Sequence, residues 1–168
     1  MAKSAATKKS ATKSTAKKAA KPATQKTTAG KDKPIKYTDK SPGQPQLTPI
    51  FAELKKLLLP YLKKGTLVER GDQPGGYSLW VDKPAKVAEG KIQDVFFAGL
   101  LIQKGYVGFY FMPVYANPAM KSQMHPDLVK CLKGKSCFHI KKNNPELMLE
   151  VKEALKMGYE DFKKKGWV

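Results

Sequence analysis

The densest run of hydrophobic positions in the chain is residues 95–115, VFFAGLLIQKGYVGFYFMPVY. The run is broken at Lys104-Gly105, and a two-residue connection with glycine second fits a primed turn, which needs positive φ. The pattern therefore predicts a β-hairpin. Its predicted register pairs Gln103 with Tyr106 and, further along the two strands, Leu100 with Phe109.

The two faces of this predicted hairpin differ in character, because side chains alternate along a strand. One face is wholly apolar and is expected to pack on the core: Phe96, Ala98, Leu100, Ile102, Val107, Phe109 and Phe111. The opposite face mixes aromatic, polar and glycine residues: Phe97, Gly99, Leu101, Gln103, Tyr106, Gly108, Tyr110 and Met112. This second face is the surface on which we expect any binding site.

The segment before the hairpin predicts a helix and two strands. Apolar residues at helical spacing predict a helix that Thr48 caps and Gly65 stops, with Pro60 either kinking it near Lys56 or ending it early. Residues 66–69 and 76–81 predict short strands, and residues 82–91 predict a loop.

The segment after the hairpin predicts two short helices at 119–123 and 127–132 and a strand at 136–141. Asn144 is expected to cap a last helix whose apolar stripe includes Val151, Leu155 and Phe162. The order of helix, strands and helix predicts an α+β domain at residues 47–168. Its antiparallel sheet should carry the N- and C-terminal helices on one face.

Residues 1–46 have a different composition. They carry 12 lysines against two aspartates, and residues 1–31 have no acidic and no aromatic residue. Such a segment cannot bury enough surface to fold, so it predicts a disordered tail and linker. Its lysines can neutralise phosphates, which gives non-specific, salt-sensitive nucleic-acid binding, here assigned to Lys8, Lys9, Lys13, Lys17, Lys18, Lys21 and Lys26. The alternative is a solubilising extension without a dedicated partner.

The remaining composition bears on location. The chain has no run of about 18 apolar residues and no apolar signal-peptide core, and only two cysteines. These features predict a cytoplasmic protein with reduced thiols and no membrane partner. If the tail binds nucleic acid, the protein would be associated with the nucleoid.

The strings KGYVGFYFMPVY at 104–115 and LKGKSCFHIKK at 132–142 resemble the YdhG-like family of small bacterial domains of largely unknown function. The resemblance spans residues 51–162 and implies the same α+β architecture. Some members are named iron chaperones by analogy with frataxin. Iron is not carried over, because carboxylates would have to hold it and this domain is net basic with scattered acids.

The four Cys and His residues of the chain fall close together in sequence: His125, Cys131, Cys137 and His139. They suggest a zinc site, with iron as the other metal, although no short CxxC knuckle is present. The alternative is ordinary buried cysteines and no cofactor. Cys137 with His139 lacks a third group that would orient the imidazole, and no nucleotide-binding motif is present, so we expect no catalytic residues and no enzyme.

The candidate ligand surface is the second face of the sheet. Its aromatic and polar side chains suit a small ligand: Trp80, Tyr106, Tyr110, Met112, Cys137 and His139. A rim of Lys104, Lys133, Lys135, Lys141 and Lys142 would favour an anionic ligand or nucleic acid. The alternatives are a half-exposed sheet without a ligand and a homo-oligomer interface. The sequence thus predicts a non-enzymatic module that binds nucleic acid through its tail, or else a small-ligand or metal-binding protein.

Overall fold

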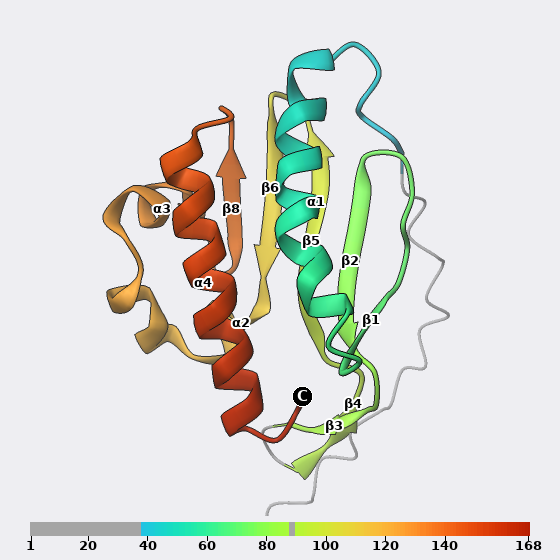
Figure 1. Cartoon of the computed structure of the whole chain (residues 1–168), viewed down its shortest axis with the longest axis vertical. Helices are drawn as coiled ribbons and strands as arrows, with labels where there is room; N and C mark the ends of the chain where they lie inside the picture. Colours follow the sequence, from blue (N-terminus) through green and yellow to red (C-terminus); the bar gives the residue numbers. More distant parts are fainter. Residues whose placement is uncertain (1–37, 88–89) are drawn as a thin grey trace, which may run out of the picture. The chain divides into compact units, whose positions relative to one another are not determined.

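The structure is a computed structural model that describes residues 38–87 and 90–168. The predicted tail lysines, Lys8 to Lys26, lie outside the described residues. The described part is built on a six-stranded antiparallel sheet in the order β1-β2-β5-β6-β8-β7 (Figure 1). Its strands are β1 (Leu67–Glu69), β2 (Gly76–Val81), β5 (Phe96–Gln103), β6 (Tyr106–Phe111), β8 (Cys137–Ile140) and β7 (Leu132–Lys133).

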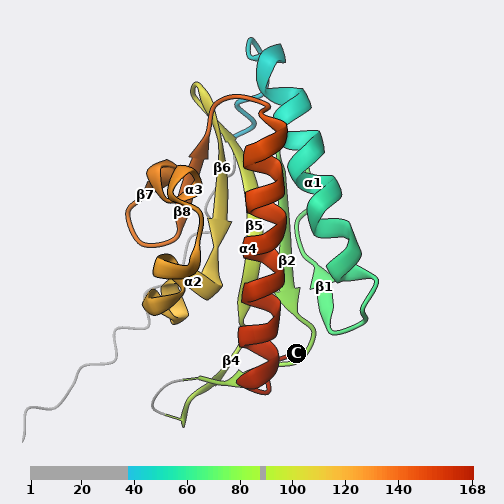
Figure 2. The same cartoon turned by 60° about the vertical axis from the view of Figure 1, so that its left-hand side comes forward.

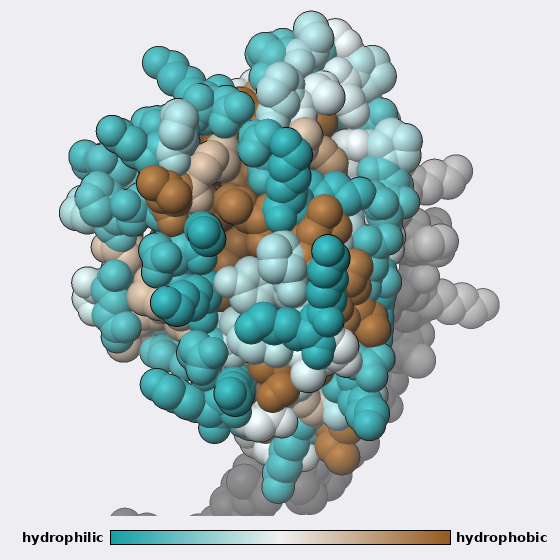
Figure 3. Space-filling model, in the orientation of Figure 1, coloured by the Kyte–Doolittle hydropathy of each residue, from teal (hydrophilic) through white to brown (hydrophobic). Residues whose placement is uncertain are grey.

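Two long helices, α1 (Thr48–Leu62) and α4 (Pro145–Lys164), cover one face of this sheet and confirm the predicted fold class (Figure 1). Figure 2 shows α4 lying lengthwise along the sheet with α1 beside it. Seen from the helix side, the surface is mainly hydrophilic, with hydrophobic patches between and beside the helices (Figure 3). The opposite face of the sheet, here called the open face, carries neither long helix.

The central hairpin has the predicted register. Gln103 pairs with Tyr106, Leu100 with Phe109 and Ala98 with Phe111. Gly105 has a φ of 82°, as the two-residue turn requires. The inner side chains Leu100, Phe109 and Phe111 are buried in the core beneath the helices.

At the first residues of the hairpin, however, the predicted assignment of side chains to the two faces is wrong. Leu79 of β2 pairs with Ala98, whereas the next residue, Trp80, pairs with Phe96, so that Phe97 is an extra residue in β5. This β-bulge points Phe97 and Ala98 into the core one after the other. The prediction of Phe96 inside and Phe97 outside is therefore wrong: Phe97 is fully buried and Phe96 lies half-buried against Trp80 on the open face.

Helix α1 differs from its prediction at its start. Thr48 does not cap it, because a short 3-10 turn, η1 (Pro45–Leu47), leads directly into the helix and Leu47 occupies the capping position without a side-chain bond. Pro60 lies inside the helix, which continues to Leu62. Proline removes one backbone donor, and the buried Leu58 and Tyr61 on either side of it hold the helix on the core. Gly65, with a φ of 77°, lies just after the helix, as predicted.

Helix α4 begins as predicted, with the Asn144 side chain accepting a hydrogen bond from the Glu146 backbone N–H at 3.0 Å. Its predicted stripe of Val151, Leu155 and Phe162 is fully buried. Gly158 lies on the same helix, where a Cβ atom would sit only 2.3 Å from Cζ of Phe111. Glycine at this position lets the helix approach the sheet closely.

The connections hold more structure than the sequence predicted. The predicted loop at 82–91 contains β3 (Ala85–Lys86), which pairs with β4 (Ile92–Gln93) in a small separate ribbon. After β6 the chain forms α2 (Met112–Ala116), η3 (Pro118–Gln123) and α3 (Pro126–Cys131), of which the last two match the predicted short helices. Met112 therefore begins a helix and does not extend the strand.

Candidate functional site

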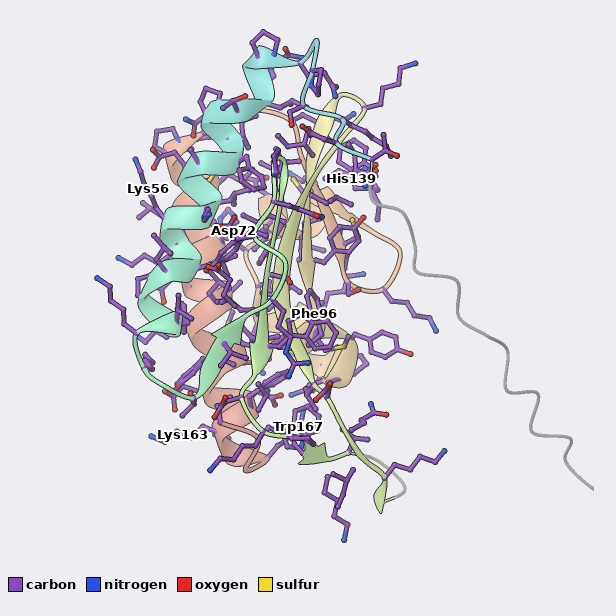
Figure 4. The ribbon with its side chains drawn as sticks, turned by 90° about the vertical axis from the view of Figure 1, so that its right-hand side faces the viewer. Lys56, Asp72, Phe96, His139, Lys163 and Trp167 are labelled. Atoms are coloured by element: carbon purple, nitrogen blue, oxygen red, sulfur yellow. The ribbon has the colours of Figure 1, made fainter. Side chains whose placement is uncertain are left out.

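The open face is built from alternate residues of four adjacent strands. Pairing places Gly99 of β5 between Ser78 of β2 and Tyr110 of β6, and Tyr110 pairs in turn with Cys137 of β8. Figure 4 shows Phe96 and His139 on the side of the sheet that faces away from the helices. The predicted face is thus formed, but its side chains gather in two separate groups.

The first group contains Tyr106, Tyr110 and His139, and is here called the ring platform. The imidazole of His139 stacks on the ring of Tyr106, with centroids 3.8 Å apart and planes 14° from parallel. The Tyr110 ring lies over Gly108, where a Cβ atom would stand 3.0 Å from its Cε2 atom. Gly108 pairs with His139 and lies between Tyr106 and Tyr110 in β6, so the three residues surround this one glycine.

The titration of the ring platform follows from its partial burial and its neighbours. Desolvation, together with the nearby Lys133 and Lys141, lowers the pKa of His139, so its imidazole is neutral at pH 7. Desolvation and the adjacent Cys137 raise the pKa of Tyr110 to about 12. Desolvation also raises the pKa of the Cys137 thiol, which disfavours the reactive thiolate.

The second group is centred on Trp80 and Phe96, whose rings meet edge to face with centroids 5.2 Å apart. The Trp80 indole N–H donates to the Ser78 hydroxyl at 3.1 Å. Above the Trp80 ring lies the guanidinium of Arg70, 5.3 Å from its centroid, and Arg70 also pairs with Asp94 at 2.9 Å. These contacts fix the Trp80 ring in place.

Next to Trp80 and Phe96 opens a pocket of about 690 Å³, here called the aromatic pocket. Its apolar walls come from segments far apart in sequence: Trp80, Val87, Val95, Phe96, Met112, Tyr115, Ala116 and Trp167. Lys86, Gln93, Asp94 and Lys165 supply its polar groups. This volume and this mixture of lining groups are typical of small-molecule sites.

Trp167 reaches the pocket because the chain turns back after α4. Its backbone N–H donates to the Phe162 carbonyl at 3.0 Å, and its ring packs edge-on against Phe162 at 4.8 Å. The Trp167 indole N–H then donates to the backbone carbonyl of Lys86 in β3 at 2.9 Å. One end of the chain thereby ties the small ribbon to the domain and closes one side of the pocket.

Charge around the aromatic pocket is partly paired. Lys165 forms an ion pair with Asp161 at 2.5 Å, and Asp94 is paired with Arg70. Lys86 carries a further positive charge on the lining. The pocket therefore combines broad apolar walls with a slightly cationic polar side.

The structure does not bring the proposed metal ligands together. Nδ1 of His125 accepts from the backbone N–H of Asp127 at 3.3 Å, and His139 is engaged with Tyr106. Within residues 38–87 and 90–168, no three His, Cys, Asp or Glu side chains form a group that could hold a metal ion. The four-ligand hypothesis for His125, Cys131, Cys137 and His139 is therefore not supported by their positions.

The six residues predicted for the ligand surface fall into two separate groups in the structure. Tyr106, Tyr110, Cys137 and His139 lie together around the ring platform, while Trp80 and Met112 line the aromatic pocket. Sequence reasoning missed Phe96, Tyr115 and Trp167. Of these, Trp167 had the clearest signal, as an aromatic residue after the helix stop at Gly166.

Comparisons with known proteins give no relative: no protein-family model, curated protein or solved structure matches the chain. The resemblance to YdhG-like domains stays a prediction. In the described part of the chain, no helix is long and apolar enough to span a membrane.

Proposed function

We propose that this protein is a non-enzymatic binding module that takes a small, largely apolar ligand into the aromatic pocket. The observation that carries the proposal is the pocket itself, about 690 Å³ of space walled by two tryptophans, a phenylalanine and a tyrosine. Burying flat apolar surface against such rings supplies affinity, and the few polar groups supply orientation. Lys86, which carries the further positive charge on the lining, favours a ligand that has an anionic group.

The test uses the unusual position of the tryptophans. The chain contains two tryptophans, Trp80 and Trp167, and both line the aromatic pocket. Titration with anilinonaphthalene sulfonate, an aromatic anion, should quench their fluorescence and transfer energy to the probe. The expected result is saturable binding with one probe per chain.

A matched pair of variants locates the probe. Ala116→Phe places a ring inside the aromatic pocket and should abolish the energy transfer. Ala119→Phe adds the same ring on the exposed surface of η3 and should leave it unchanged. Equal binding to both variants would place the probe elsewhere and contradict the proposed function.

A second candidate function, which one sequence feature favours, is attachment to nucleic acid through the tail. Residues 1–31 carry nine lysines and no acidic residue. Replacing the seven assigned lysines, Lys8 to Lys26, by glutamine in the full chain should lower the affinity for random duplex DNA. It should also flatten the dependence of binding on salt. Unchanged binding and an unchanged salt slope would remove the tail from this role.

Three further predictions concern the family, the location and the oligomeric state of the protein. Membership of the YdhG-like family, a cytoplasmic or nucleoid location and self-association all stay proposals. A homo-oligomer that used the open face would cover the aromatic pocket, so analytical ultracentrifugation with and without the aromatic probe tests both ideas together.

A further inference from the structure

The ring platform differs from the aromatic pocket in shape and in its surroundings. It lies on the open face of the sheet, where Tyr106, Tyr110 and His139 are each half-buried. The parallel stack of Tyr106 and His139 shows that this surface already accepts one planar ring on another. Rings that cover sheet glycines, as Tyr110 covers Gly108, also have a purely structural use, so the rings alone do not define a binding site.

The first such observation is the distribution of charge. Helices α1 and α4 together carry six lysines and six carboxylates, and Lys63, Lys64 and Lys165, which directly follow them, add three positive charges to the helix layer. The other described residues carry 12 Lys or Arg against six Asp or Glu. Most of the positive excess of the described residues therefore belongs to the sheet, its loops and the short helices.

The second observation concerns the lysines that lie next to the ring platform. Lys133 of β7 pairs with Cys137 of β8, two residues before His139, and Lys141 directly follows β8, two residues after His139. Both lysines also lower the pKa of His139. On another side, Nζ of Lys40 donates to Oε1 of Gln103 at 2.6 Å, and Gln103 pairs with Tyr106. Half-exposed rings are thus flanked by lysines on two sides, an arrangement that proteins use to hold bases and phosphates together.

We propose that Tyr106, Tyr110 and His139 form a platform on which bases of a single-stranded nucleic acid stack, while Lys133 and Lys141 bind its phosphates. The partner is single-stranded because a duplex hides the faces of its bases, whereas a single strand can lay them on aromatic rings. Stacking tolerates any base, so binding should be largely independent of sequence. This site goes beyond the proposed function, since the aromatic pocket takes no part in it.

The experiment measures fluorescence anisotropy of a labelled oligothymidylate about 15 nucleotides long, within the range of known single-strand sites. The protein is the full chain with the seven assigned tail lysines replaced by glutamine, so that the tail contributes little. A duplex of the same length serves as the second probe. The single strand should bind more tightly than the duplex.

Two substitutions of Tyr106 separate the effect of ring stacking from the effect of a large apolar side chain. Tyr106→Leu keeps an apolar side chain but removes the aromatic ring, and should weaken single-strand binding about five- to a hundredfold. Tyr106→Phe keeps the ring and should bind as the parent does.

The two lysines are tested separately. Lys133→Gln and Lys141→Gln should each reduce the slope of log affinity against log salt by about 0.7.

Several results would overturn this proposal. They are equal affinity for single strand and duplex, equal binding by Tyr106→Leu and Tyr106→Phe, or no anisotropy change at all. If Tyr106→Leu instead converted a dimer to a monomer in ultracentrifugation and left nucleic-acid binding unaltered, the platform would be a subunit interface. Ala116→Phe should not affect the oligonucleotide, so failure here is distinguishable from failure of the aromatic pocket.

Discussion

The two faces of the central hairpin carry similar residues in different situations. On the inner face Phe97, Phe109 and Phe111 are fully buried, and the Phe97 ring meets those of Phe111 and Phe162 at 6.0 and 5.3 Å. On the open face Phe96 and Tyr106 are half-buried, and their rings meet Trp80 and His139 on the same surface. An aromatic residue in these strands is thus a core residue on the face that the helices cover and a surface residue on the open face.

This difference separates stability from binding in one hairpin. The inner rings are held on every side by α1, α4 and the sheet, so removing one leaves a cavity. The outer rings keep part of their surface free for a ligand. The comparison can therefore be tested by changing one face at a time.

The largest effect is expected at two adjacent phenylalanines. Phe97→Ala should lower the free energy of unfolding by about 3–5 kcal/mol, because a fully buried ring is lost. Phe96→Ala, which removes the same atoms from the open face, should cost about 1 kcal/mol, because only part of that ring is taken from water. Urea denaturation of both variants checks the contrast. Equal losses would mean that the bulge does not divide the faces as described.

The next effect concerns the close approach of α4 to the sheet. In most helices Gly→Ala stabilises by about 1 kcal/mol. Gly158→Ala should instead destabilise by about 1–3 kcal/mol, because the new methyl group would lie 2.3 Å from Cζ of Phe111 and 2.7 Å from Cγ of Pro113. Thermal or urea unfolding measures the change. The double variant with Phe111→Leu should show favourable coupling, and simple additivity would rule out the clash.

A smaller effect is expected where the chain end meets the ribbon. Trp167→Phe keeps an aromatic ring but removes the indole donor to the Lys86 carbonyl, so unfolding free energy should fall by about 0.5–1.5 kcal/mol. Hydrogen exchange in the β3 and β4 segment should become faster while exchange in β5 stays slow. Unchanged exchange in the ribbon would show that the indole bond does not hold it.

The smallest effect is confined to alkaline pH. The pKa of Tyr110 is raised from 10.0 to about 12, so the folded state favours the protonated phenol. This contribution is present below pH 10 and is lost as the pH rises towards 12, and stability should fall over that window. Tyr110→Phe should have the stability of the parent at pH 7 and a less steep alkaline fall. An identical alkaline profile would show that Tyr110 titrates normally.

The sequence predicted those features that depend on short stretches. Lys104-Gly105 sets the register of the hairpin, and Asn144 followed by proline sets the start of α4. The bulge at Phe97 was missed because it exists only in the pairing of β5 with β2, which alternation within β5 cannot reveal. Phe96 was consequently placed on the wrong face.

The candidate site was predicted in part for the same reason. Residues on one strand or on paired strands, such as Tyr106 and Tyr110, follow from alternation and register. The aromatic pocket requires Trp80, Tyr115 and Trp167, which come together only through the turn after α4 and the short helix α2. No local pattern specifies such a contact.

The most direct test of the central claim, that a small ligand binds in the aromatic pocket, is a proton–nitrogen correlation spectrum during titration with anilinonaphthalene sulfonate. The two indole N–H signals belong to Trp80 and Trp167. Both signals should shift together with amides of β3 and β4, while amides on the exposed side of α1 and α4 stay in place. Shifts confined to the helices, or indole signals that do not move at saturating probe, would contradict it.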